Sequence, residues 1–187
     1  MEDLSGKKVL ITGANRGIGR GLAEGFLDAG ADLTIAALEE DVAEAAAQMS
    51  DRTGRAVGHI TCDIADLEQV MAMRAQLERV DVLINNAGLE FITPIADQAT
   101  KVDDIFRRII EINVIGTFSV TRHLLDLIPD GGRIVNTASM WGKTAVADFS
   151  AYCASKHAII GLTRALAQEL APRRISVNSV CPGWVKT

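Results

Sequence analysis

Residues 12–19 of the chain read Thr-Gly-Ala-Asn-Arg-Gly-Ile-Gly and follow directly on the apolar run 9–11, Val-Leu-Ile. Gly13 permits a tight turn, Gly17 lets a pyrophosphate approach the backbone, and Gly19 allows close packing of a helix on a strand. The helix that follows would point free N–H groups and the positive end of its dipole at a phosphate. Many glycine-rich turns only reverse the chain, so this turn alone leaves both interpretations open.

Apolar runs of strand length alternate with helical patterns along the whole chain. Strict β–α alternation predicts parallel strands with right-handed crossovers, and hence a doubly wound α/β sheet of the Rossmann type in a single domain, residues 1–187. Ligands of such sheets bind beyond the carboxyl ends of the strands. The predicted strands cover residues 9–11, 33–36, up to 60–61, 82–84, 133–136 and 175–180, and the helices about 18–29, 39–50, 67–77, 102–112 with a continuation towards 125, and 158–166.

Polar residues follow two further predicted strands, where a nucleotide would lie. Asp63 comes after the third strand, and its carboxylate could accept a hydrogen bond from an adenine amino group. Residues 85–88, Asn-Asn-Ala-Gly, come after the fourth strand and offer small and amide side chains beside the cofactor. The alternative for this segment is a turn held by Asn side-chain hydrogen bonds.

Ser139 follows the fifth strand, and Tyr152 and Lys156 come later, at the start of a predicted helix. Residues four apart share a helix face, so the ammonium can lie near the phenol. A free tyrosine has a pKa near 10, and lowering it by about 3 units requires roughly 4 kcal/mol. The ammonium and a cationic nicotinamide could supply this together in a dry cleft. The Tyr–Lys spacing arises often by chance, so the prediction depends on the combination with Ser139, the glycine turn and residues 85–88.

Together these motifs resemble the single-domain branch of the short-chain dehydrogenase/reductase family, from about Lys7 to Thr187. The resemblance implies a homodimeric or homotetrameric oxidoreductase that acts on a small carbonyl or secondary alcohol. The polar amino terminus and the cysteines, which are odd in number, favour a cytoplasmic location. It implies that Asn113 joins Ser139, Tyr152 and Lys156 as a catalytic residue, relaying protons through water, and that Lys156 also bonds the nicotinamide ribose. By its pattern alone, Asn113 is a structural hydrogen bonder or a kink in an apolar helix. The implied cofactor-binding residues are Gly13, Asn15, Arg16, Gly17, Ile18, Gly19, Ala37, Asp63, Ile64, Asn86, Ala87, Gly88, Tyr152, Lys156, Pro182, Gly183, Val185 and Thr187.

The residues after the second strand bear on the choice between NAD and NADP. NAD-binding folds place an acidic residue there to hold the ribose 2′-hydroxyl. Ala37 occupies that place, and Arg16 could bind a 2′-phosphate, which favours NADP over NAD. Against this, Glu39 and Glu40 follow at once, and a shift of one or two residues would bring a carboxylate to the ribose.

Composition excludes several other functions. The formal net charge of -5 gives no reason to expect a nucleic-acid partner, and no basic run or long apolar segment indicates a membrane. The three histidines and three cysteines lack metal-ligand spacing, so no metal is expected, and the cysteines are expected to be reduced. The candidate substrate pocket is mostly apolar and suggests a hydrophobic or cyclic substrate skeleton; its residues are Leu89, Glu90, Phe91, Met140, Trp141, Lys143, Phe149 and Trp184.

The chain stops at Thr187, whereas the family continues with a substrate-covering segment and a final strand. We therefore expect the domain to be incomplete at its carboxyl end, lacking the part that closes the pocket and helps to build the dimer interface. A non-catalytic dinucleotide-binding or regulatory protein of the same fold is the alternative, against which the Ser139, Tyr152 and Lys156 set argues. A sugar-nucleotide epimerase is disfavoured by the glycine spacing and the length.

Overall fold

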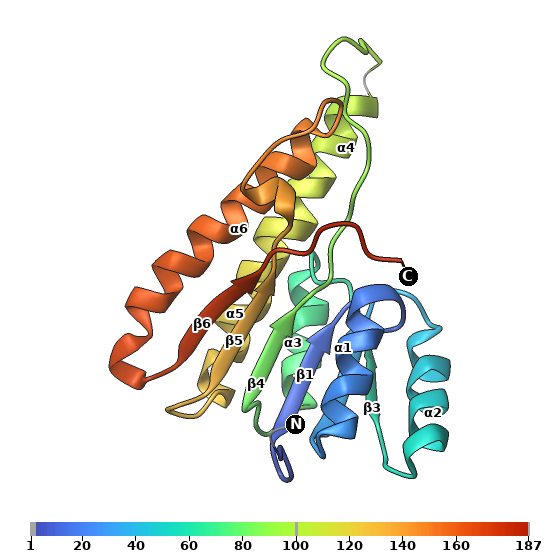
Figure 1. The fold of residues 1–187 in the computed structure, drawn as a ribbon, viewed down its shortest axis with the longest axis vertical. Helices are drawn as coiled ribbons and strands as arrows, with labels where there is room; N and C mark the ends of the chain where they lie inside the picture. The colour runs from blue at the N-terminus through green and yellow to red at the C-terminus, as the bar shows by residue number, and fades with distance from the viewer. Residues whose placement is uncertain (1–2, 100, 187) are drawn as a thin grey trace.

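The computed structural model describes residues 3–99 and 101–186, and its centre is a six-stranded sheet (Figure 1). All pairings are parallel, in the order β3-β2-β1-β4-β5-β6, which confirms the predicted doubly wound sheet. Each strand lies within a few residues of its prediction. The strands are β1 (Lys8–Thr12), β2 (Asp32–Ala37), β3 (Gly58–Thr61), β4 (Val82–Asn85), β5 (Arg133–Thr137) and β6 (Ser176–Val180).

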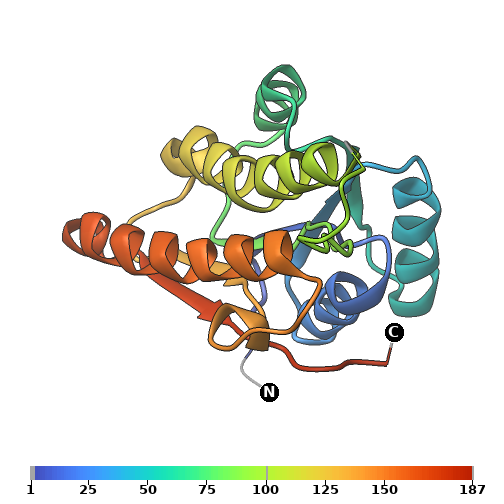
Figure 2. The same cartoon turned by 90° about the horizontal axis from the view of Figure 1, so that it is seen from above.

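Helices cover both faces of the sheet, as Figure 2 shows. Helices α1 and α2 pack with one set of buried strand residues, and α3, α5 and α6 with the other. Helix α4 packs against α6 and so lies on the second face. The helices are α1 (Gly17–Asp28), α2 (Val42–Thr53), α3 (Leu67–Ala75), α4 (Lys101–Ile110), α5 (Thr117–Leu124) and α6 (Ser150–Glu169). No helix among the described residues is both long and apolar enough to span a bilayer.

Strand β1 shows why its sequence is an unbroken apolar run. Leu10 packs into the core under α3 and α5, whereas Val9 and Ile11 pack into the core under α1 and α2. Successive side chains of a strand point to opposite faces, so a strand covered on both faces needs apolar residues at every position. Burying each such side chain contributes about 1.5–3 kcal/mol.

Helix α2 begins at Val42 rather than near Glu39, where the sequence pattern predicted it. The residues before Val42 bond to the glycine turn instead of starting the helix. Glu39 accepts a hydrogen bond from Arg16, and Asp41 accepts one from Asn15. The β2–α2 loop is thus tied to the turn after β1, a contact between segments that helix periodicity does not register.

The helical pattern that was predicted from Val102 towards Leu125 is one continuous helical segment with a change of type inside it. Between α4 and α5, residues Glu111–Gly116 form π-helix. Gly116 allows a close approach there, because a Cβ atom on it would lie 2.8 Å from Ile64 Cγ1. Short π-helical stretches inside α-helices occur frequently at functional sites, and this one contains Asn113.

Candidate active site

The glycine turn after β1 leaves its backbone bare at the carboxyl edge of the sheet. Gly13 has φ +65°, and a Cβ atom on it would lie 2.7 Å from Ala87 Cα. Gly17 also has positive φ, at 59°, and a Cβ on Gly19 would overlap the carbonyl oxygen of Gly13. Only glycine fits at Gly13 and Gly19, and the turn leads into the amino terminus of α1. This cradle fits the pyrophosphate of a dinucleotide.

A cavity of about 270 Å³ opens beside this turn, between the ends of β1, β2 and β3. Its polar side chains are held in place. Asn15 Nδ2 donates to Asp41 at 2.8 Å, and Arg16 pairs with Glu39 at 3.2 Å. Eleven of the predicted cofactor residues line it: Gly13, Asn15, Arg16, Ile18, Gly19, Ala37, Asp63, Ile64, Asn86, Ala87 and Gly88.

The Asp63 carboxylate lines this cavity, yet it is already engaged by the protein. Arg108 Nη2 donates to it at 2.6 Å, and the Ala65 backbone N–H donates at 2.9 Å. The Asp63 side chain is 18% exposed. It can still accept from an adenine amino group, but Arg108 fixes its orientation. Sequence patterns gave no indication of Arg108, which lies 45 residues away.

Asn86 joins three strand ends. Its side-chain amide donates to the Gly13 carbonyl at 2.9 Å, its backbone N–H donates to Thr12 Oγ1 at 3.0 Å, and Thr137 Oγ1 donates to its side-chain oxygen at 3.3 Å. Asn86 therefore holds the glycine turn against β4 and β5. Thr12 and Thr137 were missed as site residues, because a threonine at a strand end has no distinctive pattern.

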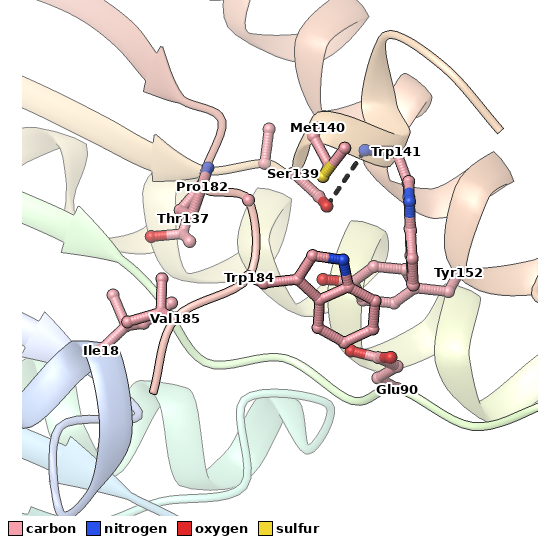
Figure 3. A pocket seen from close by; sticks show the side chains of 12 residues that line it. Ile18, Glu90, Thr137, Ser139, Met140, Trp141, Tyr152, Pro182, Trp184 and Val185 are labelled. Atoms are coloured by element: carbon pink, nitrogen blue, oxygen red, sulfur yellow. Dashed lines mark hydrogen bonds between the residues drawn. The ribbon is translucent and has the colours of Figure 1, made fainter. Parts of the chain in front are cut away.

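A second cavity, of about 290 Å³, lies beyond β5 and β6 and contains the predicted chemical group (Figure 3). Ser139 and Tyr152 line it. Ile18, from the first turn of α1, lines both cavities, so the two lie end to end along the edge of the sheet. A dinucleotide requires such a two-part groove.

Lys156 is buried beneath Tyr152, with 4% of its surface exposed. Its ammonium donates to the Thr137 carbonyl at 2.8 Å and lies 5.4 Å from the centroid of the Tyr152 ring. The predicted neighbourhood of phenol and ammonium is therefore present. Burial lowers the pKa of Lys156 from 10.5 to about 8, while the Glu90 carboxylate acts in the opposite direction. Gly88 lies close to this group, since a Cβ atom on it would lie 3.3 Å from Asn113 Oδ1 and 3.5 Å from Lys156 Nζ.

The protein groups around Tyr152 do not lower its pKa by themselves; the lowering considered from the sequence also includes the charge of an oxidised nicotinamide. Burial of the phenol raises its pKa above 10.0, the Ser139 hydroxyl partly offsets this, and Glu90 raises it further. The Lys156 ammonium does not reverse the effect, because the pocket desolvates the phenolate. The described chain by itself therefore favours the neutral phenol.

Asn113 serves as a structural hydrogen bonder, as its sequence position alone predicted. Its side-chain oxygen accepts from Leu89 N at 2.7 Å, and its amide donates to Leu89 O at 2.9 Å and to Ser155 Oγ at 3.0 Å. Ser155 in turn donates to the Tyr152 carbonyl at 2.8 Å. Asn113 thus connects the loop after β4 with the first turns of α6.

The segment after β6 forms one wall of the second cavity. Pro182, Gly183 and Val185 line it, and the Pro182 carbonyl accepts from Met140 N at 2.9 Å. Thr187, the last predicted cofactor residue, lies outside the described residues. Gly17 is not among the lining residues of either cavity.

Half of the predicted substrate residues line this second cavity: Glu90, Met140, Trp141 and Trp184. Phe149 packs against one of them, with its ring centroid 5.1 Å from that of Trp141. Leu89 lines the other cavity, and Phe91 and Lys143 line neither. Phe149 likewise lines neither cavity, so four of the eight predicted residues form no part of the wall of this second cavity.

The described residues contain no cluster of His, Cys, Asp and Glu that could hold a metal ion. The three cysteines are free, and Cys62 and Cys153 are buried. Burial raises the pKa of Cys62 to about 11, so its thiol is protonated and unreactive at neutral pH.

Comparison with known proteins relates the chain to a single family of oxidoreductases. Residues 7–187 match the family model described as short chain dehydrogenase. Oxidoreductase UcpA of Salmonella typhimurium is 37% identical over 100% of this chain and 72% of its own length. D-beta-hydroxybutyrate dehydrogenase of Cupriavidus necator is 36% identical over 98% of this chain and 72% of its own length.

Solved structures of short chain dehydrogenases share the fold of this chain. A Shigella flexneri short chain dehydrogenase superposes with a TM-score of 0.90 at 31% identity, over 98% of this chain and 74% of that one. A Shigella flexneri protein complexed with NADP superposes with a TM-score of 0.88 at 31% identity, over 96% of this chain and 78% of that one.

Proposed function

Because this chain belongs to the short-chain dehydrogenase family of oxidoreductases, we propose that it transfers a hydride between a nicotinamide dinucleotide and a small carbonyl or secondary alcohol. The observation that carries the proposal is the two-part groove. Its first cavity adjoins the glycine turn, its second contains Ser139 and Tyr152, and Ile18 belongs to both.

The residues of this groove fit a dinucleotide. The bare backbone of Gly13 and Gly19 would receive the pyrophosphate at the amino terminus of α1. Asp63 and Ile64 would adjoin the adenine, and Gly183 and Val185 the nicotinamide. When bound, the nicotinamide supplies the acceptor or donor of hydride, which carries both electrons of the reaction.

Tyr152 exchanges the proton. In alcohol oxidation the substrate O–H would give its proton to the Tyr152 phenolate while the carbon passes its hydride to the nicotinamide and the C–O double bond forms; in reduction the neutral Tyr152 phenol would give its proton to the developing alkoxide. Ser139 hydrogen-bonds the substrate oxygen and holds it within reach of the phenol. Lys156 would stabilise the phenolate through its charge and, with a dinucleotide bound, would hold the nicotinamide ribose. Asn113 would take part in a proton relay through water beside Lys156, while its side chain keeps its hydrogen bonds to Leu89 and Ser155.

We further propose that NADP is preferred over NAD. Arg16 is 78% exposed, and its ion pair with Glu39 is a surface pair of the kind that contributes about 0–1 kcal/mol. A 2′-phosphate can therefore displace Glu39 from Arg16 at little cost. Arg16→Ala is expected to raise the KM for NADPH about tenfold or more and to change that for NADH little. A wild type that prefers NADH contradicts this assignment, and in that case Glu39 is the residue that holds the ribose.

Replacing Tyr152 with Phe tests the catalytic proposal. The variant keeps the ring and its edge contact with Trp141, whose centroid lies 6.0 Å away, but it cannot transfer a proton. We expect turnover to be abolished with a panel of ketones and alcohols, measured at the nicotinamide absorbance, while the dissociation constant of the dinucleotide changes little. Unchanged turnover would refute the role of Tyr152. A wild type that binds the dinucleotide without any turnover would instead identify a binding protein.

A further inference from the structure

The loop after β4 places a single carboxylate in the wall of the second cavity. Glu90 is the one charged residue among the described residues that line this cavity (Figure 3). Within residues 3–99 and 101–186 it has no ion pair and no side-chain hydrogen bond. Its charge acts on the catalytic group, because it raises the pKa values of both Tyr152 and Lys156. The Glu90 carboxylate therefore lies where the substrate would lie, and no described side chain pairs with it.

Aromatic rings surround the same space. Trp141 lies between two rings that meet it edge-on: Trp184, with centroids 5.4 Å apart and planes at 88°, and Tyr152, at 6.0 Å and 89°. Trp184 is 85% exposed, so its indole faces remain available to a ligand. Perpendicular aromatic rings together with a carboxylate are the arrangement with which proteins bind an ammonium group, because the ring faces carry negative potential.

We propose that Glu90 selects substrates with an ammonium group near the reacting carbon, that is, amino alcohols and the corresponding amino ketones. The identification of the bound molecule as a substrate rests on the proposed function, whereas its charge preference rests on Glu90 and the rings alone. Glu90 would accept a charge-assisted hydrogen bond from the ammonium. It would also repel a carboxylate, so this pocket should reject hydroxy acids.

Three alcohols of nearly equal shape test the proposal: 1-amino-2-propanol, 2-butanol and lactate carry a cation, no charge and an anion beside the same secondary alcohol. Binding is followed by the fluorescence of Trp141 and Trp184, which are the two tryptophans of the chain and both line the cavity. This readout needs no turnover. At pH 7.5 we expect 1-amino-2-propanol to bind at least about tenfold more tightly than 2-butanol, and lactate to bind most weakly.

Glu90→Gln should remove this order, bringing the ratio of dissociation constants for the cation and the neutral alcohol to within about threefold. Glu169→Gln is the matched control, because it removes one negative charge at the far, exposed end of α6 and should keep the order. Equal binding of the three alcohols to the wild type, or an order that survives in Glu90→Gln, would overturn the proposal. If no alcohol or ketone is turned over, the proposed function fails, while the fluorescence titration still decides the role of Glu90.

Discussion

Replacing Gly13 with Ala tests whether the close approach of the glycine turn to the loop after β4 holds the nucleotide edge together. Gly13 has φ +65°, and a Cβ atom there would lie 2.7 Å from Ala87 Cα and 2.9 Å from Ala87 N. Both obstacles are backbone atoms, so no side-chain rotation can relieve the overlap. Ala87 N is moreover bonded to Thr12 Oγ1 at 3.1 Å, which limits how far this loop can retreat.

Two effects add up in the expected loss of stability. A left-handed backbone conformation costs a residue with a Cβ atom about 1–2 kcal/mol. Forcing an extra carbon into a packed site costs typically about 1–3 kcal/mol more. We therefore expect Gly13→Ala to lower the free energy of unfolding by about 2–5 kcal/mol, a large part of the roughly 5–15 kcal/mol that is typical of a folded domain. Dinucleotide affinity should fall at least about tenfold, because the bare backbone is lost.

Gly54→Ala is the matched control. Gly54 caps the end of α2 with φ +68°, almost the same as Gly13, but a Cβ atom there would meet nothing within 4 Å. This variant should lose only the conformational part, about 1–2 kcal/mol. Urea unfolding of both variants measures the difference, and dinucleotide titration of the folded proteins measures affinity. If Gly13→Ala is no less stable than Gly54→Ala, the close approach of Gly13 to Ala87 does not affect the free energy of unfolding, and the prediction is refuted.

Three further predictions concern the chemical group. Tyr152 is the one tyrosine of the chain, so phenolate absorbance near 295 nm should give its pKa directly, above 10.0 in the free protein because burial disfavours the charged form; a midpoint below 10 would contradict this. Burial lowers the pKa of Lys156 from 10.5 to about 8, so the unfolded chain binds more protons than the folded protein between these pH values. The free energy of unfolding should therefore rise with pH across that window by about 3 kcal/mol relative to Lys156→Met. If urea unfolding gives parallel pH profiles for the two proteins, the pKa of Lys156 is not lowered. Asn113→Leu should lower the free energy of unfolding by about 2–4 kcal/mol, because the buried polar groups of Leu89 and Ser155 lose their partners. A shift of the urea midpoint equivalent to less than about 1 kcal/mol would contradict this and show that water replaces the amide.

The fold was predictable because its sequence signals are local. Apolar runs as short as Val9–Ile11 and Val82–Ile84 indicate strands buried on both faces, and glycines mark the turn between β1 and α1. The rule that ligands bind beyond the carboxyl ends of parallel strands then brought Asn86, Ser139 and Tyr152 to one edge without any distance information.

What the sequence did not predict are contacts between side chains that lie far apart along the chain. Arg108 reaches Asp63 across 45 residues, and Asn113 reaches Leu89 across 24. Such pairs depend on the exact rotation of a helix, and the π-helical stretch Glu111–Gly116 alters that rotation in a way that no apolar periodicity records.

The electrostatics of the second cavity show most clearly what packing adds to spacing. A Tyr–Lys pair four residues apart suggests a phenol that is readily ionised, yet burial shifts the pKa values of both Tyr152 and Lys156 towards their neutral forms. Glu90 opposes ionisation of the phenol further, while it favours the charged ammonium of Lys156. The phenolate therefore requires additional positive charge in the cavity, which an oxidised nicotinamide would bring. A substrate ammonium bound at Glu90 would act in the same direction, because it neutralises the Glu90 carboxylate, which disfavours the phenolate. Charge selection by Glu90 and acid–base chemistry by Tyr152 are thus coupled, and the phenol should ionise more readily when a cationic substrate is bound.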